Sequence, residues 1–132
     1  MIEKIELPYR LDALEPYYNK ETLNIHYNTL YKGYVDNYNK VQEQLKNARE
    51  KNDFSNIKCL EKNLSFQGSG VILHEMFFTN MRPPTRFEVG GRLYSQINKD
   101  FGSFEGFKKQ FNEASKMVEA SRMGTFSLGT TI

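Results

Sequence analysis

Two long series of apolar residues, each repeating at steps of three or four positions, constrain the fold of this chain most strongly. Such spacing places one side chain per turn on a single face of an α-helix. The first series is Leu23, His26, Leu30, Tyr34, Tyr38, Val41 and Leu45. The second series is Ile57, Leu60, Leu64, Gln67, Val71, His74, Phe78 and Met81. A short polar segment, residues 50–55, separates them, which predicts two long helices folded into an antiparallel hairpin.

The segment before the first helix is predicted to be an extended arm. It covers residues 5–18, where Pro8 and Pro16 disfavour helix in the residues that precede them. Asn19 is then the expected N-cap of the first helix. Glu21 falls in the first turn, where a negative charge suits the helix dipole.

The second helix carries its own start, stop and packing signals. Asp53 or Ser55 is the expected cap at its beginning, and the proline pair at residues 83–84 ends it. Gly68 and Gly70 interrupt it at a cost of about 1 kcal/mol each relative to alanine. Glycines retained at such a cost predict the close approach of another backbone or of a bulky side chain.

Two shorter helices are predicted after the prolines. The apolar residues of the first are four positions apart and are Val89, Leu93, Ile97 and Phe101. Ser103 is the expected N-cap of the second, whose apolar face is Phe104, Phe107, Phe111, Ala114 and Val118. The remaining residues, 121–132, are rich in glycine, serine and threonine and show no periodicity.

The composition argues against several classes of protein. The 132 residues include 18 Lys and Arg against 16 Asp and Glu, and a net charge of +2 is too small for a dedicated nucleic-acid surface. No stretch of about 20 apolar residues is present, so no membrane span is expected, and the first residues lack the apolar core of a signal peptide. Cys59 is the single cysteine, which excludes an internal disulfide and favours a cytoplasmic location.

The chain has two histidines, His26 and His74, and each falls on the inward series of one hairpin helix. In an antiparallel hairpin, such positions can face each other. A histidine on an apolar face is more often a core residue hydrogen-bonded to a carbonyl group. Two facing imidazoles also suit a metal ion, because neutral imidazole is the commonest metal ligand in proteins. Periodicity alone leaves both interpretations open.

A redox-active iron or manganese centre also uses a carboxylate ligand. The acidic residues nearest in the sequence, Glu21 and Glu75, do not share the inward faces with the histidines, so periodicity predicts half of a metal site. Tyr34 lies two turns after His26 on the same face. It is either a packed tyrosine whose hydroxyl reaches water, or a residue that holds bound solvent or passes a proton.

Several motifs resemble those of the iron/manganese superoxide dismutases, in order, from residue 5 to residue 121. In the arm and the first helix they are Leu7-Pro8-Tyr9, Asp12-Ala13-Leu14-Glu15-Pro16, Thr22, Ile25-His26 and Tyr34-Val35. In the second helix they are Phe66-Gln67-Gly68-Ser69-Gly70, Leu73-His74-Glu75-Met76-Phe77-Phe78 and Asn80-Met81. After the prolines they are Ile97, Asp100-Phe101-Gly102-Ser103-Phe104 and Phe107-Lys108.

The resemblance implies an antioxidant oxidoreductase that converts superoxide to dioxygen and hydrogen peroxide at a single manganese or iron ion. By this resemblance His26 and His74 match two of the metal ligands, and Tyr34 matches a catalytic tyrosine at the substrate channel. Gly70 stands where iron-type members often have glutamine, which favours manganese. Members are dimers or tetramers, so a homo-oligomer is expected.

The resemblance also implies the fold and its division into domains. The fold expected is mainly α, with the arm and helical hairpin in residues 1–82. Residues 83–132 are expected to form the first helices of an incomplete α/β (α+β) C-terminal domain.

The chain departs from the family pattern at several positions. Leu30 and Val71 stand where members often have histidines. The family continues past residue 121 through a Gly-Trp motif, a three-stranded sheet and the aspartate and histidine ligands, so a truncated member with half of the ligand set is expected. Arg122-Met123-Gly124 replaces Gly-Trp. A methionine codon followed by a glycine codon contains the tryptophan codon TGG one base later, so residues 123–132 are predicted to be an out-of-frame tail.

Three functional classes therefore remain open at the level of the sequence. The chain is a superoxide dismutase by descent that is inactive alone, or an enzyme completed by a partner chain or a second copy that supplies the missing half. In the third class it is a binding or structural protein whose exposed hairpin face pairs with a partner.

Overall fold

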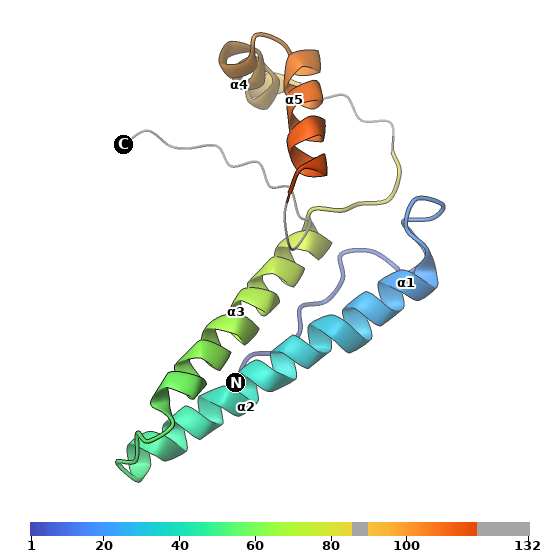
Figure 1. Cartoon of the computed structure of the whole chain (residues 1–132). Coiled ribbons are helices and arrows are strands. Elements are labelled where there is room, and N and C mark those ends of the chain that lie inside the picture. The colour runs from blue at the N-terminus through green and yellow to red at the C-terminus, as the bar shows by residue number, and fades with distance from the viewer. Residues whose placement is uncertain (86–89, 119–132) are drawn as a thin grey trace. The chain divides into compact units, whose positions relative to one another are not determined.

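The structure is a computed structural model of the chain, and it describes residues 1–85 and 90–118 (Figure 1). Its elements are α1 (Lys20–Ile25), the π-helical segment η1 (His26–Tyr31), α2 (Lys32–Glu50), α3 (Ile57–Thr79), α4 (Gly91–Phe101) and α5 (Phe104–Lys116). The described residues contain no strand, which agrees with the predicted mainly α fold. The chain divides into two compact units, Met1–Pro84 and Thr85–Ile132.

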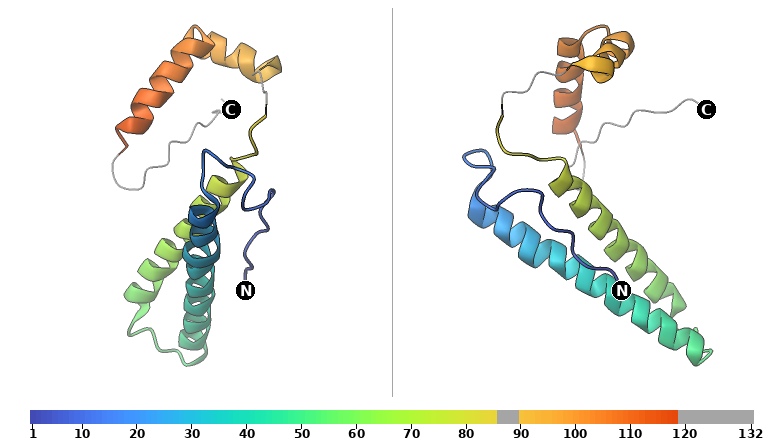
Figure 2. Two further views of the ribbon diagram at one scale, coloured as in Figure 1. Left: turned by 90° about the vertical axis from the view of Figure 1, so that its right-hand side faces the viewer. Right: turned by 180° about the vertical axis from the view of Figure 1, so that it is seen from behind.

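The first unit is an antiparallel helical hairpin, as the two apolar series predict. Helix α1, η1 and α2 follow one another without a break, and α2 packs along α3 (Figures 1 and 2). Asn19 is the N-cap, because its Oδ1 accepts hydrogen bonds from the backbone N–H groups of Glu21 at 2.8 Å and Thr22 at 3.3 Å. The predicted start of the first helix is therefore confirmed.

The first long helix contains a π-helical segment that the periodicity did not predict. Hydrogen bonding from residue i to i+5 adds a residue to the turn, which shifts the inward face by one position over this stretch. Leu30, predicted to face inward, is therefore 53% exposed, and Tyr31 is fully buried in its place. The prediction for Leu30 is wrong, whereas Leu23, Val41 and Leu45 are buried as expected, and the other members of the series are half-buried.

In the second helix the predicted apolar face agrees with the structure, whereas the predicted N-cap does not. Val71 and Phe78 are buried, and the remaining members of the apolar series are half-buried. Helix α3 begins after Asn56, whose side chain makes no capping hydrogen bond, so the prediction of a cap at Asp53 or Ser55 is wrong. The Asp53 carboxylate instead accepts a hydrogen bond from the Ser55 backbone at 3.0 Å and stabilises the turn itself.

The N-terminal arm is extended only in its first part. Residues 11–17 form successive turns, with the Tyr17 N–H donating to the Leu14 carbonyl at 3.0 Å, so the prediction of an extended segment is wrong there. These turns place Leu14 in the core of the hairpin, where 5% of its surface remains exposed. Local hydrogen bonding and burial together outweigh the extended preference set by the prolines.

The arm is fastened to the π-helical segment by tyrosines. The Tyr31 hydroxyl accepts a hydrogen bond from the Ile5 N–H at 3.1 Å, and the Tyr27 hydroxyl donates to the Ile5 carbonyl at 2.6 Å. The ammonium group of Lys4 lies 3.7 Å from the centre of the Tyr27 ring. The core of the unit lies between arm and hairpin, and its buried members are Leu14, Leu23, Tyr31, Val35, Val71 and Phe78.

The second unit contains α4 and α5, whose positions agree with the predicted pair of short helices. Ser103 caps α5, because its Oγ accepts a hydrogen bond from the Gly106 N–H at 3.0 Å. Gly102, at φ +78°, makes the turn between the two helices. Val89 and the predicted out-of-frame tail, residues 123–132, lie outside the described residues. Within residues 1–85 and 90–118, no helix has the length and apolar character needed to cross a membrane.

Candidate metal centre

The two histidines meet inside the hairpin. His26 is the first residue of η1 and His74 lies in α3, and the centres of their rings are 4.9 Å apart. Both side chains are half-buried. The fold thus brings together two imidazoles that are 48 positions apart in the sequence.

A backbone carbonyl orients His74. Its Nδ1 lies 2.6 Å from the carbonyl oxygen of Gly70, one turn earlier in α3. A carbonyl only accepts hydrogen bonds, so Nδ1 carries the proton and Nε2 keeps its lone pair. This is the arrangement typical of a metal-binding histidine, in which a hydrogen bond to one ring nitrogen sets the tautomer and leaves the other nitrogen for the metal.

A tyrosine hydroxyl is the partner of His26. The Nδ1 atom of His26 and the hydroxyl oxygen of Tyr18 are 2.9 Å apart, and either group can be the donor. Burial, followed by the proximity of His74, lowers the pKa of His26 below its ordinary value. Burial raises the pKa of the Tyr18 phenol. Both groups are therefore neutral at pH 7, and neutral imidazole is the form that binds metals.

Aromatic rings surround the two imidazoles and fix their planes. The ring of His26 lies 4.9 Å from Phe77 and 5.1 Å from Phe78, measured between ring centres. Tyr31 stacks on His74 at 5.8 Å with an angle of 16° between the planes. Packing of this kind restricts the rotation of both imidazoles and keeps water away from their sides.

The stacked tyrosine connects His74 to the arm and to a carboxylate. Besides accepting from Ile5, the hydroxyl of Tyr31 donates to Glu75 Oε1 at 3.0 Å. Burial, more than the nearby carboxylate, raises the pKa of Tyr31 to about 12. The sequence did not point to Tyr31 or Tyr18. Tyr31 faces inward only because of the π-helical shift, and Tyr18 lies in the segment predicted to be extended.

Tyr34 lies beside His74, with 5.0 Å between the ring centres. Its ring also lies against the α3 backbone at Gly70, where a Cβ atom would come closer than 3.0 Å to three ring carbons of Tyr34. A Cβ at Gly68 would lie 3.2 Å from the Tyr38 ring. The prediction that these glycines admit bulky neighbours is therefore confirmed.

The donor set suits part of a manganese or iron site. Two neutral imidazole nitrogens are ligands that both metals accept together with carboxylate oxygen. Within the described part of the chain, no group of three or more His, Cys, Asp or Glu side chains is arranged to hold a metal ion. The pair formed by His26 and His74 therefore fits such an ion without completing its ligand set.

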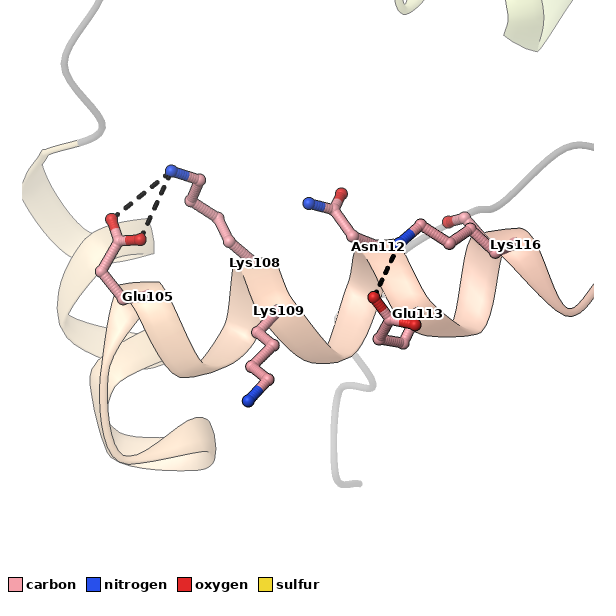
Figure 3. Close-up of a pocket in the computed structure, with 7 residues that line it drawn as sticks. Glu105, Lys108, Lys109, Asn112, Glu113 and Lys116 are labelled. Carbon is pink, nitrogen blue, oxygen red and sulfur yellow. Dashed lines mark hydrogen bonds and ion pairs between the residues drawn. The ribbon is translucent and has the colours of Figure 1, made fainter.

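A separate depression of about 630 Å³ lies on α5 of the second unit (Figure 3). Its lining residues are Glu105, Lys108, Lys109, Asn112, Glu113, Ser115 and Lys116. Lys108 pairs with Glu105 at 3.4 Å and Lys116 with Glu113 at 2.8 Å, all on exposed side chains. Exposed pairs of this kind contribute about 0–1 kcal/mol each, so this is a solvated helix surface.

Comparison with known families agrees with the geometry of the hairpin. The model of the alpha-hairpin domain of iron/manganese superoxide dismutases matches residues 3–82. The chain belongs to this family. The model of the C-terminal domain of the same superoxide dismutases matches residues 89–129. That range includes residues 123–129 of the tail predicted to be out of frame, and the prediction stays open.

Individual superoxide dismutases show the same relationship. An iron superoxide dismutase of Methanothermobacter marburgensis is 46% identical over 118 residues, which are 88% of this chain and 58% of the relative. One from Pyrobaculum aerophilum, also named for iron, is 41% identical over 86% of this chain and 54% of its own length. A manganese superoxide dismutase of Haloferax volcanii is 39% identical over 83% of this chain and 55% of its own length. The chain thus spans little more than half the length of these curated relatives.

Proposed function

We propose that this chain forms part of a superoxide dismutase in which His26 and His74 are two of the protein ligands of a manganese or iron ion. One observation carries the proposal. The two imidazole rings lie edge to face with 4.9 Å between their centres, and a carbonyl accepts the Nδ1 proton of His74, so that Nε2 keeps its lone pair. Family membership supports the proposal, because named relatives are superoxide dismutases of both metals.

The reaction proposed converts two superoxide ions and two protons into one molecule of dioxygen and one of hydrogen peroxide. A bound manganese or iron ion supplies the one-electron redox chemistry that this reaction requires. The residues of the chain hold the ion, fix the imidazole planes and exclude water from their sides. Phe77 and Phe78 pack against the ring of His26, and Tyr31 packs against the ring of His74.

Tyr34 is proposed as the catalytic tyrosine of this site. Its ring lies next to that of His74, so its hydroxyl is a candidate to hold bound solvent or to supply a proton to reduced substrate.

Manganese is the metal that the site favours in this proposal. A glutamine at position 70, the residue that suggests iron, has a Cβ that would overlap the ring of Tyr34. The glycine therefore supports the manganese or dual-metal type, although relatives are named for both metals.

Within residues 1–85 and 90–118 no third His, Cys, Asp or Glu side chain is grouped with this pair, and a second copy of the chain or a partner chain is proposed as the source of further ligands. A cytoplasmic location is also proposed, since Cys59 is a free, exposed thiol of the kind that a reducing compartment preserves.

Metal analysis together with an activity assay tests the proposal. The chain is purified from cells supplied with manganese, its metal content is measured by mass spectrometry, and superoxide decay is followed directly. Near-stoichiometric metal with dismutation is expected, and both should be lost in His26→Gln and in His74→Gln. Tyr17→Phe is the matched control, because Tyr17 is 84% exposed. Protein that contains no metal, or whose metal content is unchanged by both histidine substitutions, would contradict the proposal.

A further inference from the structure

Tyr18 occupies a position that the proposed function does not explain. It lies between the turns of the arm and the N-cap of α1, and its hydroxyl reaches Nδ1 of His26 at 2.9 Å. Three contacts fix it there. Its N–H donates to the carbonyl of the buried Leu14 at 3.0 Å, its ring meets the edge of Phe77 at 6.2 Å, and its hydroxyl meets His26.

We propose that Tyr18 is the positioning residue of His26 and fixes the tautomer in which Nδ1 carries the proton. The proposal rests on the proposed function, because it concerns the second of the two imidazole ligands. In this arrangement Nδ1–H donates to the Tyr18 oxygen, and Nε2 keeps its lone pair for a metal ion. Tyr18 then does for His26 what the Gly70 carbonyl does for His74.

The surroundings of Tyr18 favour this direction of the hydrogen bond. Tyr18 lines a groove of about 560 Å³ with Leu14, Tyr17, Phe77, Asn80, Met81, Arg82 and Pro84. The groove is open to solvent at Tyr17, which is 84% exposed. Because Tyr18 lines this groove, its O–H proton can turn toward the groove while an oxygen lone pair stays available to Nδ1–H of His26. A phenol accepts and donates at the same time, so both bonds coexist.

The inference differs from simple packing in what it requires of the hydroxyl group. A phenylalanine at position 18 keeps the ring, the contact with Phe77 and the backbone hydrogen bond to Leu14, and it removes only the partner of Nδ1. A purely structural role for Tyr18 predicts no change in the protonation of the His26 ring. A positioning role predicts that the proton redistributes between Nδ1 and Nε2.

The decisive experiment is the tautomer of His26 in the metal-free chain. The protein is labelled with ¹⁵N-histidine, and long-range ¹H–¹⁵N spectra are recorded at about pH 8, above the ordinary pKa of histidine near 6.5. We expect protonated Nδ1 in the wild type and in the Tyr17→Phe control, and a shift toward protonated Nε2 in Tyr18→Phe. A wild-type His26 protonated at Nε2 overturns the inference without reference to any variant, and so does an unchanged tautomer in Tyr18→Phe.

Manganese affinity separates this inference from the proposed function. Free Mn²⁺ is titrated against each protein and measured by electron paramagnetic resonance. Loss of an outer partner of a ligating histidine costs about 10–100-fold in metal affinity, which is the weakening expected for Tyr18→Phe, with less than about 2-fold for Tyr17→Phe. Equal Mn²⁺ affinity in the wild type and Tyr18→Phe overturns the inference. A wild type that binds no Mn²⁺ contradicts the proposed function, and the tautomer then decides the inference alone.

Discussion

The two units of the chain are built from similar amphipathic helices and differ in how much they bury. In Met1–Pro84, six apolar side chains form one buried cluster, whereas Ile97 is the one buried hydrophobic side chain among residues 90–118. The helices of the second unit place Phe104, Phe107 and Phe111 on one face, and these rings stay half-buried. The difference is a third element, because the arm of the first unit adds Leu14 and the partners of Tyr27 and Tyr31.

The comparison explains where a metal site can be held rigidly. Ligands keep their geometry only where surrounding side chains are locked by packing and hydrogen bonds. His26 and His74 lie against the packed cluster, in contact with Phe78, which has no exposed surface.

Removal of an aromatic side chain should destabilise the first unit much more than the second. Phe78→Ala removes a fully buried ring that contacts both histidines, and its expected cost is about 3–5 kcal/mol in the free energy of unfolding. Phe111→Ala, in the half-buried face of α5, should cost less than about half as much. Denaturant unfolding monitored by circular dichroism measures both, and equal costs would show that the two units are packed alike.

Gly70→Ala tests the close contact between α3 and Tyr34. The added Cβ overlaps the Tyr34 ring, and overpacking of this kind costs about 1–3 kcal/mol. Gly33→Ala is the matched control, because a Cβ there meets nothing within 4 Å, so the helix should gain about 0.5–1 kcal/mol. Thermal unfolding compares the two variants. A Gly70→Ala protein as stable as Gly33→Ala would mean that Tyr34 does not lie against Gly70.

Substitution of the N-cap residue in each unit should have a smaller effect on stability. Asn19→Ala and Ser103→Ala each remove a side-chain acceptor from the first turn of a helix, at a cost of about 1 kcal/mol. The loss at Asn19 should lower the unfolding midpoint of the hairpin. The loss at Ser103 should reduce helical signal in the second unit and leave the hairpin midpoint unchanged. A hairpin midpoint lowered equally by both substitutions would show that the units unfold together.

The turn of the hairpin should show a small dependence on pH. Hydrogen bonds from Ser55 lower the pKa of Asp53, so its charged form favours the folded state. The resulting stability is present above the ordinary carboxylate pKa of about 4 and is lost as the pH falls through the lowered value. Asp53→Asn should therefore reduce the difference in unfolding midpoint between pH 7 and pH 3. If the wild type and the variant lose stability equally on acidification, Asp53 contributes nothing to it.

The sequence predicted those features that depend on local spacing. The hairpin follows from two series of apolar residues, the cap from Asn19, and the close approach of Tyr34 from Gly70. The pairing of His26 with His74 follows from their places in the two series, whereas their role as ligands is still a prediction.

The features that could not be predicted depend on contacts between distant segments. The π-helical segment exposes Leu30 and buries Tyr31, whose hydroxyl is bonded to Ile5, 26 residues earlier. Periodicity reports only the spacing of residues along one helix, so it gives no information about contacts between that helix and the N-terminal arm. The partner of His26, Tyr18, was hidden for the same reason, because it reaches the imidazole only after residues 11–17 form turns.

The central claim is that His26 and His74 together hold one metal ion. Pulsed electron paramagnetic resonance of the Mn²⁺-loaded protein, labelled with ¹⁵N-histidine, tests it most directly, because each directly bound imidazole gives a nitrogen coupling. The wild type should show couplings from both histidines of the chain, and His26→Gln and His74→Gln should each remove one. A spectrum without nitrogen coupling, or one that neither substitution changes, would contradict the claim.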